Sequence, residues 1–305
     1  MATVQPVSFS SVPGFQLQHI LVATDFSDCS RHALMQAAAL ARSHKSNIVV
    51  LHVVPSEPMI QNALEPASWE HQDRIHRAQS EMASAEIVDS LAGVPYELLV
   101  EDGALKAVLA ATIQDREISL LVLGTHGRTG MKKVLLGSVA EQIFRLAECP
   151  VLTVGPREPS ALLTHGRFES VLFATDFSPG SLHALSYAIA FAQESKARLT
   201  LMHAVEEGSV TALYLHERLL ADARKRLDEL VPQNAGFAFA PEVEIVDGFP
   251  FDQILAIAAK KKADLIVMGV HKSGAFGART AAHLPWSIAQ SVVCHAKCPV
   301  LTVRG

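Results

Sequence analysis

Several features that mark well-known protein classes are missing from this sequence. Its formal net charge is -5, so it lacks the surplus of basic residues that a nucleic-acid-binding surface needs. No apolar run approaches the ~20 residues of a membrane-spanning helix. Residues 1–18 lack a basic segment followed by a continuous apolar one, and so do not resemble a signal peptide. We expect a cytoplasmic protein with no nucleic-acid or membrane partner.

Cysteine is also scarce. The four cysteines are Cys29, Cys149, Cys294 and Cys298. The last two form a C-x3-C pattern, but a zinc site would need two more ligands, and His295 is the only one nearby. Reduced thiols in a cytosolic protein are the expected state. The sequence therefore predicts no metal site.

Two common nucleotide-binding fingerprints are absent. There is no G-x4-G-K-[S/T] phosphate loop. There is no G-x-G-x2-G dinucleotide loop either. The HxGH motif of some synthetases and the SGGxDS loop of some pyrophosphatases are also missing. What the chain does contain is a glycine-punctuated segment that follows an apolar run, at residues 124–138.

The chain is an internal repeat. Residues 19–27 recur at residues 170–178, where Asp25 is matched by Asp176 (176 − 25 = 151). Residues 149–154 recur at residues 298–303 (298 − 149 = 149). A period near 150 residues indicates two domains rather than a solenoid. Because residues 155–160 are rich in Pro and Gly, as linkers are, we predict domains over residues 1–155 and 156–305.

Each half alternates apolar, strand-like runs with helical patterns. In the first half the strands are predicted near residues 19–24, 48–54, 95–100, 119–124 and 151–154, and the helices near 28–43, 68–91, 103–116 and 138–147. Ser27 and Ser178 are placed to cap the first helix of each half, and Pro179 suits a first helical position. This alternation predicts an α/β fold whose parallel sheet carries helices on both faces.

The glycine-punctuated segment is suited to holding a phosphate. Glycine lets the backbone approach a bulky anion, and the first amides of the next helix are unpaired at its positive end. Gly124, Gly127, Gly137 and Ser138 give the spacing G-x2-G-x9-G-[S/T]. In the alternative interpretation the first two glycines serve a tight turn and Ser138 only caps a helix, since residues 138–141 form a capping box.

This spacing resembles the ATP-binding motif of the universal stress protein family. The A-T-D-F-S opening, the L-H-V end of the second strand and the C-P-V-L-T-V ending are similar to that family as well. The resemblance implies two tandem Rossmann-like, adenine nucleotide α-hydrolase-like domains with strand order 3-2-1-4-5. It also implies an intramolecular pseudo-dimer in which residues 151–154 pair antiparallel with residues 300–303, and it leaves a further homodimer open.

The resemblance implies that the first half binds ATP, with or without Mg²⁺. The expected contacts are Thr24, Asp25, Val53, Gly124, His126, Gly127, Arg128, Gly137, Ser138 and Val139. Asp25 would lie beside the nucleoside, although its carboxylate also suits a helix cap. Val53 would pack on adenine, or is simply a core valine. His126 could contact phosphate or Mg²⁺, or only its own backbone, and AMP or a cyclic nucleotide could replace ATP.

The second half departs from this motif. Lys272 replaces the second glycine, and Trp286 stands where the first half has Gly137. An indole cannot occupy a position where the backbone must approach a phosphate, and Pro285 removes an amide donor. Ser287 survives, but it is again part of a capping box. We predict that this half does not bind ATP in the family manner.

Three classes of function are compatible with these patterns. Beyond Asp25 and His126 no acid–base pair or metal cluster lies near the loop, so no activated nucleophile is predicted. We therefore expect an ATP-binding stress-response or signalling module with unknown protein partners. The alternative is a slow ATP hydrolase or a nucleotidyl or phosphoryl transferase. A purely structural module is disfavoured by the intact glycines of the first half.

Overall fold

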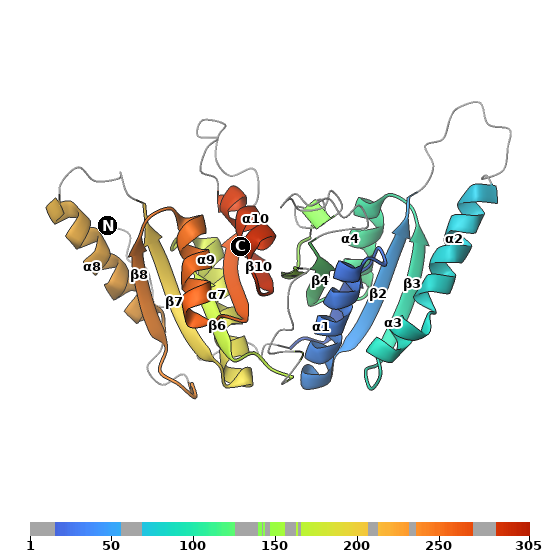
Figure 1. Cartoon of the computed structure of the whole chain (residues 1–305), viewed down its shortest axis with the longest axis horizontal. Helices are drawn as coiled ribbons and strands as arrows, with labels where there is room; N and C mark the ends of the chain where they lie inside the picture. Colours follow the sequence, from blue (N-terminus) through green and yellow to red (C-terminus); the bar gives the residue numbers. More distant parts are fainter. Residues whose placement is uncertain are drawn as a thin grey trace, which may run out of the picture.

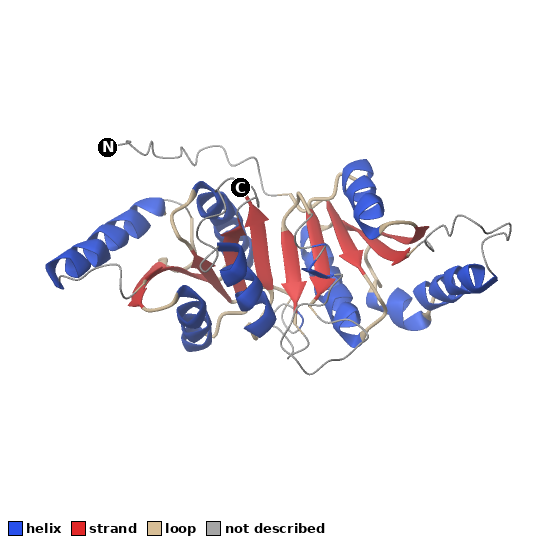
Figure 2. Cartoon of the chain, turned by 90° about the horizontal axis from the view of Figure 1, so that it is seen from above, coloured by secondary structure: helices blue, strands red, loops and turns tan. Residues whose placement is uncertain are grey.

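The computed structural model describes residues 16–55, 69–125, 140–141, 143, 147–155, 163, 166–206, 213–231, 236–270 and 285–305. Within these residues, ten strands form one continuous sheet and helices cover both of its faces (Figures 1 and 2). The predicted α/β class is therefore confirmed.

The first half contributes five parallel strands. Its elements are β1 (His19–Ala23), α1 (Asp28–His44), β2 (Asn47–Val54), α2 (Trp69–Met82), α3 (Ala85–Ser90), β3 (Tyr96–Asp102), α4 (Leu105–Asp115), β4 (Leu120–Gly124) and β5 (Val151–Val154). The spatial order β3-β2-β1-β4-β5 is the order 3-2-1-4-5 that the family resemblance implies. Ser27 caps α1, as predicted, by accepting a hydrogen bond from the amide of Ser30.

The second half repeats this arrangement. Its elements are β6 (Ser170–Ala174), α7 (Pro179–Ser195), β7 (Arg198–Val205), α8 (Leu213–Leu230), β8 (Glu242–Asp247), α9 (Pro250–Lys261), β9 (Leu265–Val270), α10 (Pro285–His295) and β10 (Val300–Arg304). Its strands follow the order β8-β7-β6-β9-β10. Ser178 caps α7 and Pro179 opens it, which confirms both sequence predictions.

The two halves meet where β5 pairs with β10. This pair is antiparallel, with Leu152 opposite Leu301 and Val151 opposite Thr302. The hydroxyl of Thr153 donates to the carbonyl of Val300 at 3.1 Å, which adds a side-chain bond across the seam. The antiparallel pairing implied by the resemblance is therefore confirmed. Neither last strand is left as an exposed edge that could recruit another chain.

Both faces of the sheet are buried, which explains the near-continuous apolar strands. Side chains such as Val22, Val50 and Val122 pack on one face with α1, α2, α3, α7 and α8. Leu21, Val49 and their neighbours pack on the other face with α4, α9 and α10. Successive residues of a strand alternate between these two cores.

One predicted helix is wrong, and one lies mostly outside the described residues. The helix expected over residues 68–91 is broken into α2 and α3, because Ser84 has extended backbone angles (φ -63°, ψ 149°). Arg31 of α1 contacts Glu81 on one side of this break and Glu86 on the other. Arg31, which is distant in sequence, thus contacts the end of α2 and the start of α3. Of the helix expected near residues 138–147, the structure describes residues 140, 141 and 143, which are helical, and residue 147, which is not.

Candidate functional site

The carboxyl ends of β1 and β4 form the point where strand order reverses. The chain leaves β1 toward β2 on one side, and leaves β4 toward β5 on the other. The amide of Thr24 bonds to the carbonyl of Leu51, and that of Thr125 to the carbonyl of Val154, so both strands remain held past their ends. In open α/β sheets, ligands bind in the crevice beyond such a point.

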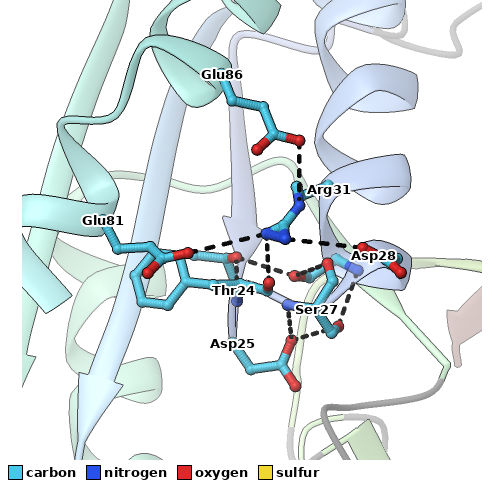
Figure 3. A network of polar contacts seen from close by, with 9 residues as sticks. Thr24, Asp25, Ser27, Asp28, Arg31, Glu81 and Glu86 are labelled. Atoms are coloured by element: carbon cyan, nitrogen blue, oxygen red, sulfur yellow. Dashed lines mark hydrogen bonds and ion pairs between the residues drawn. The ribbon is translucent and has the colours of Figure 1, made fainter. Parts of the chain in front are cut away.

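A tight turn connects β1 to α1 at this crevice (Figure 3). Phe26 adopts a left-handed conformation with φ 62°, which is unusual for an aromatic residue. Its amide donates to the hydroxyl of Thr24 at 3.0 Å. The carboxylate oxygen Oδ1 of Asp25 accepts from the amide of Ser27 at 3.1 Å and from its hydroxyl at 2.6 Å. This oxygen of Asp25 therefore stabilises the start of α1, as the capping interpretation requires.

A histidine supports the same turn from β2. His52 Nδ1 donates to the carbonyl of Thr24 at 2.8 Å, and its ring lies 4.5 Å from the ring of Phe26. The second half repeats this arrangement with His203, whose Nδ1 lies 2.8 Å from a threonine carbonyl, and Phe177 at 4.5 Å. The sequence showed both histidines as part of the repeat, but their function in the turn was not predicted. The L-H-V motif is thus explained by support of the turn.

Gly124 lies so close to α1 that no side chain fits. A Cβ atom there would be 2.8 Å from the carbonyl carbon of Cys29 and 3.0 Å from its Sγ atom. The matching residue, Gly269, is under the same constraint, with Ser181 backbone atoms at 2.4 Å. Since the second half keeps this glycine while lacking other parts of the motif, helix packing explains Gly124 without a ligand.

Val53 lies at the carboxyl end of β2, next to the crevice. It is opposite Glu101 of β3, and its partly buried side chain packs against the core on the α4 face. This position agrees with the core-valine interpretation and also leaves the residue at the rim where a ligand could contact it.

Arg31 connects the turn to the helices that flank the crevice (Figure 3). Its guanidinium donates to the carbonyl of Phe26 and contacts Asp28 at 3.7 Å, Glu81 at 4.0 Å and Glu86 at 3.2 Å. The second half has Leu182 at this position (182 − 31 = 151). This cluster was not predicted from the sequence.

A second unpredicted contact joins α2 to the end of β3. His71 Nε2 lies 2.8 Å from Asp102, and Arg74 lies 2.9 Å from its Nδ1. A guanidinium only donates, so Nδ1 accepts from Arg74 and Nε2–H donates to the carboxylate of Asp102. His216 and Asp247 repeat this pair at 2.9 Å. The equal offsets (216 − 71 = 145 and 247 − 102 = 145) were a usable signal in the sequence.

Much of the predicted phosphate loop lies outside the described residues. These positions are His126, Gly127, Arg128, Gly137, Ser138 and Val139. In the second half, Lys272 and the side chains of Pro285, Trp286 and Ser287 are also outside them. The structure therefore describes four of the ten predicted contacts: Thr24, Asp25, Val53 and Gly124.

The described residues also bear on metals, thiols and membranes. Among them, no group of three His, Cys, Asp or Glu side chains could hold a metal ion. Burial raises the pKa of Cys149 to about 11 and that of Cys298 to about 12, so both thiols stay protonated at neutral pH. Within the described ranges, no helix has the length and apolar character required to cross a bilayer.

Comparison with known proteins places this geometry in a family. The model of the universal stress protein family matches residues 16–155 and 167–304. A universal stress protein of Mycolicibacterium smegmatis is 26% identical over 298 residues, covering 93% of this chain and 96% of that protein. One of Thermus aquaticus is 34% identical over 143 residues, covering 44% of this chain and 96% of that protein.

Solved structures agree on the fold. The crystal structure of a universal stress protein from Archaeoglobus fulgidus has a TM-score of 0.66 and 23% identity, and the match covers 95% of this chain and 99% of that one. Because the family model covers both repeats, and because the strand order and the turns of the crevice occur twice, the chain belongs to the universal stress protein family.

Proposed function

We propose that the first half binds an adenine nucleotide, ATP, at the carboxyl ends of β1, β2 and β4. The observation that carries this proposal is where the glycine-punctuated segment begins. Gly124 ends β4 beside the turn that holds Asp25, at the reversal of strand order. Residues 126–139 then supply the expected phosphate contacts, with or without Mg²⁺, and Val53 would lie near the base. The glycine backbone and the helix start that the sequence predicts after Gly124 would suit a polyphosphate.

The second half, in this proposal, is a pseudo-symmetric partner. Its sheet continues that of the first half through β5 and β10, so a single chain supplies the pairing that would otherwise need two. We propose domains over residues 1–155 and 156–305, of which the first takes the nucleotide. Nucleotide occupancy would then serve a cytoplasmic stress response by altering contacts with protein partners.

The proposal is tested by calorimetry with ATP on the full chain. We expect one ATP per chain, and loss of binding in Gly127→Trp because an indole would fill the phosphate position. The matched control is Lys272→Trp, at the equivalent position of the second half (272 − 127 = 145), which should leave binding unchanged. Nucleotide released from the purified protein on denaturation should be ATP rather than AMP or a cyclic nucleotide.

Three results would contradict the proposal. They are two ATP molecules bound per chain, unchanged affinity in Gly127→Trp, and equal loss in both tryptophan variants. The first would restore the second half as a nucleotide site. The other two would place the phosphates away from the glycine-punctuated segment.

A further inference from the structure

The second half contains a cleft on the side of the sheet that carries α8. Its volume is about 590 Å³, within the usual range for small-molecule sites. Phe177, His203, Val205 and Ala223 line it, between the ends of β6 and β7 and the helix α8. Ala204, which matches the proposed adenine contact Val53 (204 − 53 = 151), lies between two of these residues and so points to the opposite face. Asp176, which matches the proposed nucleotide contact Asp25, also lines the cleft, so the cleft reaches the equivalent crevice at this one residue but otherwise lies on the α8 side.

Two opposite charges on the rim have no ionic partner among the residues that the structure describes. Arg226 and Asp222 both line the cleft, one helical turn apart on α8, yet do not pair with each other. The guanidinium carbon of Arg226 lies 3.9 Å from the centre of the Phe177 ring, so the aromatic face fixes its position. The neighbouring rim charges, Lys225 and Glu229, face each other at 3.9 Å.

The equivalent positions of the first half are arranged differently. Arg77 matches Asp222 and pairs with Asp73 (222 − 77 = 145). Glu81 matches Arg226 and contacts Arg31 (226 − 81 = 145). Both charges are thus reversed in sign and already neutralised within the protein. The unpaired pair is specific to the second half.

Phe177, Val205 and Ala223 give the cleft an apolar floor, to which the His203 ring adds a polar atom, and the Asp176 carboxylate lies at its edge. His203 donates from Nδ1 to the carbonyl of Thr175 at 2.8 Å. Burial lowers the pKa of His203, so the ring is neutral at pH 7 and its Nε2 carries a lone pair. Val205 and Ala223 are buried beside it, and the exposed side chain of Leu219 adds apolar surface at the mouth.

We propose that this cleft is a second site, for a free α-amino acid with an apolar or aromatic side chain. The carboxylate would bind Arg226, the ammonium would bind Asp222, and the side chain would lie over the floor. The two charged groups of an amino acid share one carbon, which suits side chains whose Cβ atoms are ~5–6 Å apart at i and i+4 of a helix. A ligand with only a negative charge would be repelled by Asp222, and one with only a positive charge would be repelled by Arg226. This inference goes beyond the proposed function, since neither the nucleotide nor the glycine-punctuated segment takes part.

The test is calorimetry of the full chain with L-phenylalanine. We expect one site per chain, and affinity at least about tenfold weaker in Arg226→Gln and in Asp222→Asn, because each removes one charge-assisted contact. The matched controls are Arg224→Gln and Asp228→Asn, exposed residues of the same helix that do not line the cleft, which should bind as the wild type does. 3-Phenylpropionate and phenethylamine, which each carry one charge, should bind more weakly than the amino acid.

Several results would overturn the proposal. They are absence of binding with both L-phenylalanine and L-leucine, affinity unchanged by both cleft substitutions, and a singly charged analogue binding as tightly as the amino acid. ATP titrations of the same four variants should match the wild type, because the proposed nucleotide site is in the other half. Failure of the amino-acid site would then be distinct from failure of the proposed function.

Discussion

Substituting Gly124 tests whether this glycine serves helix packing. In Gly124→Ala the new Cβ atom would lie 2.8 Å from the carbonyl carbon of Cys29 and 2.9 Å from its oxygen. Favourable carbon–carbon contacts need ~3.5–4.0 Å, so β4 and the first turn of α1 must separate by ~0.5–1 Å. Overpacking of this kind costs about 1–3 kcal/mol of unfolding free energy. We expect a loss in the upper part of this range, because the clashing atoms of Cys29 belong to the backbone and cannot rotate away.

The assay is urea unfolding at equilibrium, with the midpoint compared at unchanged slope. Gly155→Ala is the matched control, because its Cβ would meet only one neighbouring atom, the carbonyl oxygen of Ala296 at 3.8 Å. We expect that variant to be within ~1 kcal/mol of the wild type. Gly269→Ala, with backbone atoms at 2.4 Å, should cost at least as much as Gly124→Ala. A stable Gly124→Ala, or a neutral Gly269→Ala beside a destabilised Gly124→Ala, would refute packing as the reason for both glycines.

Three further substitutions test other contacts. Burial raises the pKa of Asp264 from 3.8 to about 6, so the fold favours the protonated carboxyl. This carboxyl should therefore lower the unfolding free energy by up to about 3 kcal/mol as pH rises from 4 to above 6. Urea titrations of Asp264→Asn should lack this pH dependence, and the same dependence in the variant would contradict the prediction. Arg31→Leu, which copies the second half, should cost about 1 kcal/mol through the lost bond to the Phe26 carbonyl, since its carboxylate partners are exposed, and no change in the urea midpoint would count against the contact. His71→Leu should lower the unfolding free energy by about 1–3 kcal/mol, because Asp102 loses the hydrogen bond from the buried His71. A melting temperature equal to that of the wild type would show that this bond between α2 and β3 does not stabilise the fold.

Some features of the site followed from the sequence and others did not. The repeated A-T-D-F-S segment indicated a strand followed by a capped helix, and Ser27 and Ser178 cap as expected. The sequence pattern could not decide whether Asp25 contacts a nucleoside or caps a helix. One of its carboxylate oxygens bonds to Ser27 at the start of α1, whatever the second oxygen contacts. Gly124 was read as part of a phosphate motif, since nothing local reveals that α1 lies against it.

Sequence by itself determined the elements, because their signals are local. Apolar runs of four to eight residues, periodic helices and capping serines depend on neighbours a few positions away, and the equal offsets revealed two copies. The tertiary structure alone decided what distant residues do to one another. The break between α2 and α3 is flanked by contacts from Arg31, about fifty positions earlier. Arg226 and Asp222 line one cleft beside α8 without ionic partners in the described part of the chain, whereas their first-half equivalents are paired. Such contacts form only when the parallel sheet brings strand ends and helices together, which no short stretch of sequence encodes.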